Sequence, residues 1–372
     1  MDLALSPEQE ELARSARSFL ATVMPAPGAP AVRSDDEALF AEMAALGWVG
    51  LLLPEAHGGG GGTLSDLAVV AAEAGRALAP TVLFSAVAAA RLVELAGTEA
   101  QRRALLPGLA AGSARATVAL HEPDHEELDS LATSLEAAGD GLALVGEKRF
   151  VADAVGASHL VVAARRPGEP GVSTLVLVPP GSPGVEVVPV GTFGGDRQAA
   201  VSLRRVAVSE EDVLGAPGEG RRPLERVLAE TTALQSVEMV GGARRALELA
   251  VEHVSRREQF GRTLGTFQAV QHHVADVAIA VDAADLAAWQ AVWALEHDRP
   301  STAAVSMAKV AAGDAYRRAT LTAFQLCGGA GYVTDHPLHR YADRAKAASL
   351  TAGSTVDHLA RLTAGLGLGT GG

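Results

Sequence analysis

The sequence contains a single cysteine, Cys327, among 372 residues. A lone cysteine excludes an internal disulfide and a metal cage built from thiolates. Cys327 lies beside apolar residues and a glycine-rich turn, so we expect a small buried side chain rather than a reactive thiol. The pairs His272–His273 and His336–His339 have no evident third ligand near them in the sequence, so we expect no metal site.

Positive charge is also scarce. The chain has 31 Lys and Arg residues against 44 Asp and Glu residues, a net charge of −13. Nucleic acids and anionic membranes both require a basic face, so we expect neither as a partner. No basic and then apolar segment opens the chain, and charged residues interrupt the apolar stretch at residues 67–95. We therefore expect no secretory signal, no transmembrane span and a cytoplasmic location.

Aromatic residues make up only 4% of the chain, but hydrophobic residues reach 48%, which is enough for a core and excludes wholesale disorder. The abundant alanine favours closely packed helices. A chain of 372 residues is too long for one compact core, so we expect two or three domains.

Helical spacing marks residues 1–114, the first expected domain. Ser6, followed by proline and glutamate, is a suitable cap for the first helix. Residues 35–46 and 63–79 show the same apolar spacing. Residues 54–62 end in five consecutive glycines and predict a loop, which is no P-loop because no Gly-Lys-Ser/Thr follows.

The rest of the chain shows two further patterns. Residues 115–218 carry short apolar runs separated by Pro, Gly and Asp, which predicts a small antiparallel β domain. These runs lie at residues 142–145, 160–163, 173–178 and 185–188. Residues 219–372 return to long helical patterns, which predicts a four-helix bundle. Its helices are expected over residues 224–257, 268–296, 301–326 and 337–364.

Two sequence blocks carry the most information. Residues 257–276 read R-E-Q-F-G-R-T-L-G-T-F-Q-A-V-Q-H-H-V-A-D, and residues 325–337 read Q-L-C-G-G-A-G-Y-V-T-D-H-P. The forked guanidinium of Arg257 suits a diphosphate, although a charged helix end with a surface turn would look the same. The glycines from Gly328 onward let a backbone approach a ligand closely. They do not form a dinucleotide fingerprint, because the third glycine is lacking and a helix precedes them.

These two blocks resemble the signature segments of the acyl-CoA dehydrogenase family, whose members hold FAD and desaturate acyl thioesters. Helices, a β domain and a four-helix bundle also follow one another in that family, so the resemblance covers nearly the whole chain. It implies an α+β fold with an N-terminal helical domain, a central β domain and a C-terminal four-helix bundle. Softer matches occur at Leu53-Pro54-Glu55, Gly146-Glu147-Lys148, Val206-Ala207-Val208 and Val213-Leu214-Gly215.

The resemblance also implies which residues bind the cofactor. Arg257 would reach the FAD of a neighbouring subunit, with Phe260 packing nearby, and Gln268 would contact the same cofactor. The residues implied to lie against the adenosine-diphosphate half of FAD are Gln325, Gly328 and Gly329. The resemblance further implies lipid metabolism, an acyl-CoA substrate, a homo- or hetero-tetramer with another dehydrogenase chain, and an acceptor such as an electron-transfer flavoprotein.

The central region departs from the family pattern. The family has Thr-Glu-Pro followed by Gly-Ser-Asp, which contact the flavin ring and the thioester end. Here His121 replaces the threonine before Glu122 and Pro123, and Asp-His-Glu-Glu at residues 124–127 replaces the small turn. Bulky side chains therefore stand where the resemblance implies small ones.

The catalytic base of the family is missing as well. Its reaction needs a carboxylate that removes the α-proton while hydride leaves the β-carbon for the flavin. The glutamate of the family's Glu-Gly-Thr segment corresponds to Ala352, which precedes Gly353 and Ser354. Some members place the glutamate 26 residues before the motif arginine, and that position is Thr231.

Two nearby carboxylates are candidate substitutes. Glu230 lies on an apolar stripe with Val227 and Leu234, where it would be desolvated, as suits a base. Glu238 follows Thr231 by seven residues and shares its helix face. Each carboxylate also fits a salt bridge inside the bundle or a solvated flank.

Three functions remain open on this evidence. The chain is a dehydrogenase subunit whose partner supplies the base, as in mixed assemblies of actinobacterial sterol degradation, or a self-sufficient dehydrogenase that uses Glu230 or Glu238. The third function is a flavin-dependent oxygenase or a non-catalytic scaffold on the same fold. The two missing glutamates and the altered residues 121–127 favour the first function, and the fold alone does not decide.

Overall fold

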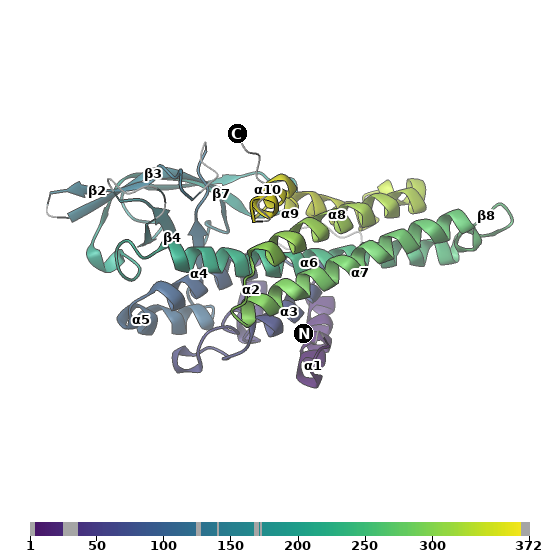
Figure 1. Ribbon diagram of the computed structural model, residues 1–372, viewed down its shortest axis with the longest axis horizontal. Coiled ribbons are helices and arrows are strands. Elements are labelled where there is room, and N and C mark those ends of the chain that lie inside the picture. Colours follow the sequence, from purple (N-terminus) through teal and green to yellow (C-terminus); the bar gives the residue numbers. More distant parts are fainter. Residues whose placement is uncertain are drawn as a thin grey trace.

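The chain folds into helices, then strands, then helices again (Figure 1). The computed structural model describes residues 4–24, 36–123, 128–139, 141–166, 171 and 173–365. The order of elements agrees with the predicted helical, β and bundle regions, and the exact boundaries between those regions remain a prediction.

Capping side chains start several of the N-terminal helices. These helices are α1 (Pro7–Val23), α2 (Asp36–Ala45), α3 (Leu64–Ala77), α4 (Val82–Ala96) and α5 (Glu99–Ala110), with a 3-10 turn at Glu55–His57. Ser6 caps α1 as predicted: its hydroxyl accepts from the Gln9 amide at 3.2 Å, and the Gln9 side chain accepts from the Ser6 amide at 3.1 Å. Thr63 and Thr98 form the same capping box at α3 and α5.

The central strands form two sheets. The strands are β1 (Ala116–Ala119), β2 (Ser134–Ala138), β3 (Gly141–Ala152), β4 (His159–Ala164), β5 (Thr174–Val178), β6 (Val185–Val190) and β7 (Gln198–Val208). One sheet has the order β1-β4-β5 and the other the order β2-β3-β7-β6. The four predicted apolar runs fall in β3 to β6, whereas β1, β2 and β7 were not singled out from the sequence.

One strand pair corrects the expectation of a purely antiparallel β domain. β1 pairs with β4 in parallel, with Ala116 opposite His159 and Ala119 opposite Val162. The chain between these strands crosses to the other sheet as the β2–β3 hairpin, and β4 then returns in the direction of β1. Parallel pairing requires such a long crossover, which the alternation within a single strand does not reveal.

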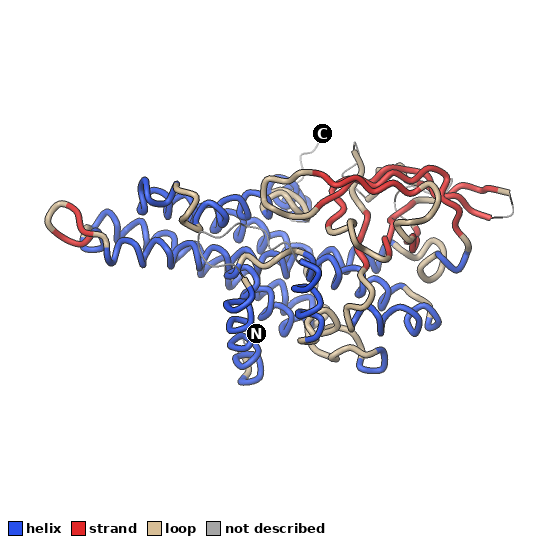
Figure 2. The backbone as a smooth tube through the Cα atoms, turned by 180° about the vertical axis from the view of Figure 1, so that it is seen from behind, coloured by secondary structure: helices blue, strands red, loops and turns tan. Residues whose placement is uncertain are grey.

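The three-stranded sheet is covered on both faces. Along β4, Leu160 and Val162 face a core shared with the four-stranded sheet, while Val161 and Ala163 face a core that includes α4 and α5. Successive side chains of a strand point to opposite faces, so a strand covered on both sides reads as a continuous apolar run. Figure 2 shows the strands of these two sheets gathered at one end of the molecule, with helices beneath them.

A long helical bundle extends away from the sheets (Figure 1). Its helices are α6 (Arg221–Arg256), α7 (Gln268–Glu296), α8 (Thr302–Cys327), α9 (Leu338–Ala348) and α10 (Thr355–Gly365). The single helix predicted over residues 337–364 is wrong, because the chain breaks there into α9 and α10. Left-handed backbone at Ala352 (φ 59°) and Gly353 (φ 99°) ends the helical path. The Ser354 amide then donates to the Asp357 carboxylate at 2.7 Å, where α10 begins.

Helix α7 meets the length and composition criteria for a membrane span. From the sequence we expected no such span. Its most apolar window has a mean hydropathy of 1.3, and 39% of that window is buried. In the bundle α7 packs against α6 and α8, and its Asp285 pairs with Arg244 of α6 at 2.8 Å. One such helix is weak evidence for a membrane protein, because the apolar helices of a bundle core meet the same criteria.

Candidate active site

The first sequence block forms the turn at the far end of the bundle (Figure 1). After α6, the two-residue strands β8 (Glu258–Gln259) and β9 (Arg262–Thr263) make a small hairpin. Phe260 (φ 56°) occupies its tip and is 87% exposed. Its ring meets the Phe267 ring edge-to-face at 6.2 Å, and Arg262 lies 4.0 Å above the Phe267 ring. An aromatic side chain this exposed is a candidate contact for another molecule.

The second block lies at the same end of the bundle, where α8 ends (Figures 1 and 2). Cys327 is 5% exposed, as expected, and its burial raises the pKa of the thiol. Gly328 leaves the helix with a positive φ of 56°, and both Gly328 and Gly329 are exposed. A Cβ atom added at either glycine would meet no described atom within 4 Å. The structure thus places the two blocks at the same end of the bundle, where the backbone of Gly328 and Gly329 is open.

Three polar side chains at this end of the bundle fit an anionic cofactor. Arg257, Gln268 and Gln325 are all exposed. Within the described ranges of the chain, no hydrogen bond or ion pair engages their side chains. A guanidinium and two amides with free N–H groups match the oxygen acceptors of a diphosphate. The residues present therefore fit the nucleotide half of FAD.

Neither family position for the base carries an acid. Ala352 lies in the loop between α9 and α10. Thr231 lies on α6, and its hydroxyl donates to the Val227 oxygen at 2.9 Å and approaches the Leu228 oxygen at 3.2 Å. The threonine is therefore engaged with its own helix.

Glu230 is buried, as predicted, but two arginines hold its carboxylate. The side chain is 3% exposed. Arg91 of α4 donates to one oxygen at 3.1 Å, and Arg226 of α6, the helix that carries Glu230, donates to the other at 2.6 Å. Arg91 also pairs with Glu94. These contacts favour the salt bridge that the sequence left open as an alternative to a base.

Glu238 is held in the same manner. It is 4% exposed, and Arg344 of α9 donates to one of its oxygens through Nε at 2.9 Å and Nη2 at 2.7 Å. The third guanidinium nitrogen of Arg344 donates to Asp196 at 2.6 Å. Arg344 therefore holds one carboxylate oxygen of Glu238, and a base role for Glu238 stays a prediction without support from these contacts.

Lys148, from one of the softer sequence matches, forms a buried ion pair with Glu122 of the altered central region. Lys148 is fully buried and donates to Glu122 at 2.7 Å and to the Leu120 oxygen at 3.0 Å. Glu122 also accepts from the amides of Ala132 at 2.6 Å and Thr133 at 3.0 Å. Burial opposes the charged form, but Lys148 and these hydrogen bonds together lower the pKa of Glu122. Glu122 thus ties its own segment to the backbone at Ala132 and Thr133. The altered residues 124–127 lie outside the described ranges.

Sequence reasoning missed two buried basic side chains near position 352. Lys309 of α8 is 2% exposed and donates to the backbone oxygens of Ala348 and Thr351. His358 of α10 is 1% exposed and lies 3.0 Å from the Ala352 oxygen. A signal existed for Lys309, because it is one of three lysines in the chain and interrupts an Ala- and Val-rich helix.

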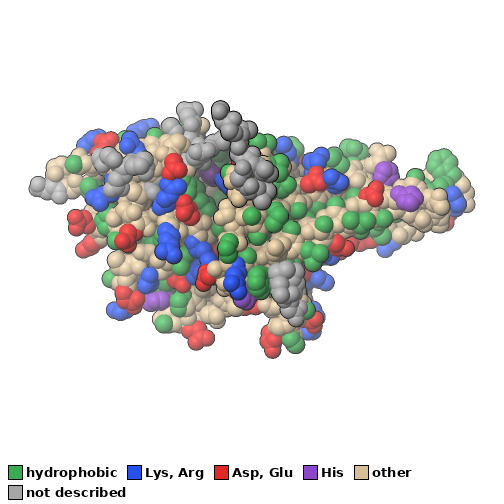
Figure 3. Space-filling view, viewed as in Figure 1, with side chains coloured by type: hydrophobic (Ala, Val, Ile, Leu, Met, Phe, Trp, Pro, Cys, Tyr) green, Lys and Arg blue, Asp and Glu red, His purple; other side chains and the backbone are tan. Residues whose placement is uncertain are grey.

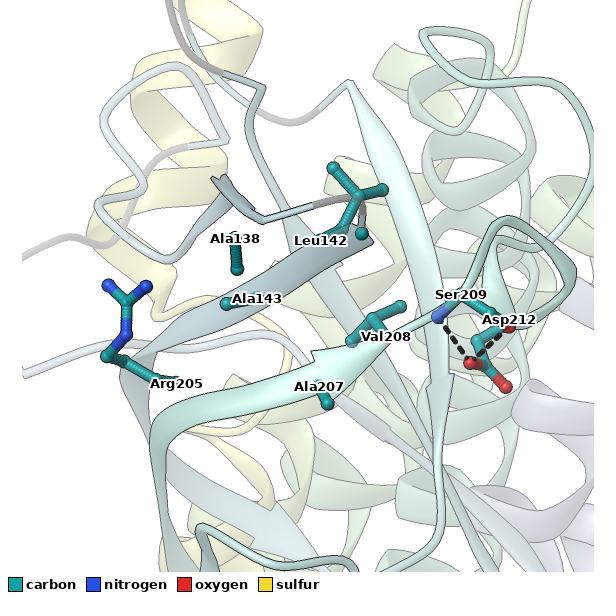
Figure 4. Close-up of a pocket in the computed structure, with 9 residues that line it drawn as sticks. Ala138, Leu142, Ala143, Arg205, Ala207, Val208, Ser209 and Asp212 are labelled. Carbon is teal, nitrogen blue, oxygen red and sulfur yellow. Dashed lines mark hydrogen bonds between the residues drawn. The ribbon is translucent and has the colours of Figure 1, made fainter.

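A separate pocket of about 450 Å³ lies on the four-stranded sheet (Figure 4). Leu142 and Val208 supply much of its apolar lining. Its polar side chains bond to other protein groups: Ser209 donates to Asp212 at 2.7 Å, and Arg205 pairs with a neighbouring glutamate at 3.4 Å. None of the predicted site residues lines this pocket.

Comparisons with known proteins agree with this architecture. Residues 6–113 match the acyl-CoA dehydrogenase N-terminal domain, and residues 218–366 match the acyl-CoA dehydrogenase C-terminal domain. The chain is 32% identical over 368 residues to probable acyl-CoA dehydrogenase FadE25 of Mycobacterium tuberculosis, covering 95% of this chain and 94% of the relative. The chain belongs to the acyl-CoA dehydrogenase family of flavoprotein oxidoreductases.

Two solved structures are similar over almost the whole chain. The Tcur3481–Tcur3483 steroid ACAD is 34% identical with a TM-score of 0.84, covering 97% of this chain and 98% of that chain. The ChsE4–ChsE5 complex from Mycobacterium tuberculosis is 26% identical with a TM-score of 0.89, covering 99% of both chains. The predicted fold class is therefore confirmed.

Proposed function

We propose that this chain is the base-less subunit of a heteromeric, FAD-dependent acyl-CoA dehydrogenase, which desaturates an acyl thioester between its α- and β-carbons. One observation carries the proposal: neither family position for the base holds a carboxylate. Ala352 and Thr231 stand at those positions. The neighbouring Glu230 and Glu238 are both engaged by arginines.

The far end of the bundle is the proposed cofactor contact. Arg257, Gln268 and Gln325 would hold the nucleotide half of FAD with the open backbone of Gly328 and Gly329. This end lies far from the α9–α10 loop of the same chain (Figure 1), so the FAD it contacts would belong mainly to a neighbouring subunit. An exposed guanidinium that none of the described residues engages is suited to that contact.

The proton transfer is the step assigned to the partner. FAD, when bound, accepts the hydride from the β-carbon, and a base must remove the α-proton at the same time. In this chain, arginine N–H groups already engage both oxygens of Glu230 and one oxygen of Glu238. A carboxylate engaged in this way does not point at a substrate. The partner chain therefore supplies the proton acceptor.

Two kinds of observation support a partner chain. The similar steroid ACAD and the similar ChsE complex are each named as a pair of components. Figure 3 shows hydrophobic side chains scattered over the surface of the bundle. Several large apolar side chains exposed along the same packed helices are compatible with a protein interface. On α6, α7 and α8 they include Val251, Ile279, Leu286, Met307 and Leu321.

The proposal extends to the substrate and the electron acceptor. An acyl-CoA is the proposed substrate, because the similar relatives are named as acyl-CoA dehydrogenases. Electrons then pass to an acceptor such as an electron-transfer flavoprotein, and the assembly is a cytoplasmic tetramer. The net charge of −13 supports a protein without a nucleic-acid partner.

Co-expression tests this function. The chain is purified alone and together with the dehydrogenase chain encoded beside it, and the mass, flavin content and acyl-CoA-dependent dye reduction are measured. We expect a yellow, active complex and a single chain with turnover lower by more than about a thousandfold, because no base is present in it. Equal turnover by the single chain would contradict the proposal.

Glu230→Gln in both preparations separates the alternatives. In a complex whose partner supplies the base, turnover should stay within about threefold of the unsubstituted complex, as should turnover of the Thr231→Val control. A loss of more than about a hundredfold in Glu230→Gln alone would instead identify a self-sufficient dehydrogenase. Oxygen consumption by reduced flavin without acyl-CoA would identify an oxygenase, and a colourless protein in every preparation would identify a scaffold.

A further inference from the structure

The loop between α9 and α10 has a backbone shape that local sequence does not favour. Ala352 adopts a left-handed conformation with φ 59°, and Gly353 follows with φ 99°. Glycine adopts positive φ readily, whereas alanine is strained there. A strained residue persists only where its surroundings hold it. The contacts around residues 349–354 therefore have to restrain this loop.

Lys309 of α8 holds the loop on one side. Its side-chain nitrogen donates to the backbone oxygens of Ala348 at 2.5 Å and Thr351 at 2.6 Å, and to the Gln235 side chain at 2.8 Å. These three acceptors surround the nitrogen and take up its N–H groups. Lys309 is 2% exposed, so the loop carbonyls meet this side chain instead of water.

His358 of α10 holds the next carbonyl. Its Nε2 lies 3.0 Å from the Ala352 oxygen, and its Nδ1 lies 3.2 Å from the Ser306 hydroxyl. Burial lowers the pKa of His358, which favours the neutral ring. In that form Nε2–H donates to Ala352 and Nδ1 accepts from Ser306. Ser306 and Lys309 both belong to α8, so one helix anchors the loop through both side chains.

We propose that Lys309 and His358 are positioning residues that clamp the 349–354 loop against α8 and keep position 352 in a defined place, although that position carries no carboxylate. The significance of position 352 rests on the proposed function, whereas the clamp itself rests on the contacts above. It follows that only the carboxylate has been lost here, and that the backbone which would present it is still held.

Hydrogen exchange of the loop tests the clamp directly. The amides of Ser349, Leu350, Thr351, Ser354 and His358 all donate hydrogen bonds, so their exchange reports the loop. We expect the peptide spanning residues 349–358 to exchange at least about tenfold faster in Lys309→Met than in the unsubstituted chain. Unchanged protection of that peptide would overturn the proposal.

The control is Lys346→Met. Lys346 is an exposed lysine on α9, and its replacement removes the same charge close to the same loop. We expect exchange within about twofold of the unsubstituted chain in this variant. An equal loss of protection in both variants would show a general effect of charge and would also overturn the proposal.

His358 provides a second test that does not depend on Lys309→Met remaining folded. In His358→Gln the side-chain amide can take the place of Nε2–H, whereas His358→Leu offers no donor. Protection of the loop should be retained in His358→Gln and lost in His358→Leu. Equal protection in the two variants would contradict the role of His358.

A further experiment uses Ala352→Glu, which should gain exchange of the acyl-CoA α-proton. Adding Lys309→Met to Ala352→Glu should abolish that gain. If the unsubstituted chain alone already exchanges the α-proton while the hydrogen-exchange results hold, the proposed function fails and the clamp stands.

Discussion

Two of the three lysines in the chain, Lys148 and Lys309, are buried among acceptors. Burial lowers the pKa of Lys148 to about 8, against the opposing charge of Glu122. Burial likewise lowers the pKa of Lys309 to about 7 from 10.5, with Glu238 acting in the opposite direction. A charged group taken out of water is disfavoured unless its partners compensate for the lost hydration. The folded chain therefore binds fewer protons at these two positions than the unfolded chain at mildly alkaline pH.

Lys309 should make stability depend on pH in a predictable direction. Its pKa is lower in the folded state, so the associated stability is complete above the unfolded value of 10.5 and is lost as pH falls through about 7. The free energy of unfolding of the unsubstituted chain should rise relative to that of Lys309→Met from pH 7 to about 9.5, by up to roughly 1.4 kcal/mol per pH unit, and the gap in melting temperature should widen with it. Thermal melts over this range, with Lys346→Met as the flat control, measure it. Parallel curves for the unsubstituted chain and Lys309→Met would contradict the assignment.

At the scale of elements, helices α3 and α6 cross at two glycines. A Cβ atom on Gly75 would lie 1.9 Å from the backbone oxygen of Glu238. A Cβ atom on Gly241 would lie 2.1 Å from the backbone oxygen of Ala72. Only glycine permits two backbones to approach so closely. This crossing packs the N-terminal helices onto the long helix that also carries Thr231.

Gly241→Ala should therefore destabilise the chain by about 1–3 kcal/mol, because the two helices must separate to admit the methyl group. Gly313 of α8 is the matched control, since an added Cβ there meets its nearest atom at 3.7 Å. Gly313→Ala should be neutral or should stabilise by up to about 1 kcal/mol through helix propensity. Chemical denaturation of both variants measures their free energies of unfolding. Equal losses of stability in the two variants would argue against a close crossing of α3 and α6.

At the scale of the whole molecule, Arg344 joins three parts of the chain. It donates to Glu238 of α6, to Asp196 in the segment before β7, and to the Ala79 oxygen after α3 at 3.3 Å. Arg344 is only 8% exposed, so these contacts take the place of hydrogen bonds to water. A buried ion pair of this kind adds little net stability, but removing one partner leaves an uncompensated charge.

Arg344→Met should destabilise the chain by about 3–5 kcal/mol, because Glu238 and Asp196 would both remain buried without their cation. Adding Glu238→Gln and Asp196→Asn to that variant should recover part of the loss, since the neutral amides need no counter-charge. Arg204→Met is the control, because Arg204 is 75% exposed and its loss should change stability by less than about 0.5 kcal/mol. The four proteins are compared by denaturant midpoint. A triple variant no more stable than Arg344→Met would show that the network does not act through charge.

Much of this protein was recognisable from short stretches of sequence. The Ser6 cap, the strand runs in β3 to β6 and the long helices α6 to α8 depend on the spacing of residues close together in the chain. The two family blocks depend only on residue identity and order. Family membership and the fold class followed from these features, and the cofactor residues named from them remain a prediction.

Other features required the folded chain. Arg91 meets Glu230 across 139 positions, and Arg344 meets Glu238 across 106, so no local pattern could show these two contacts. The parallel pairing of β1 with β4 and the clamp of Lys309 on the loop at Ala352 likewise join distant segments. Burial and the choice of a charge partner depend on which segments pack together, and packing is settled by the chain as a whole.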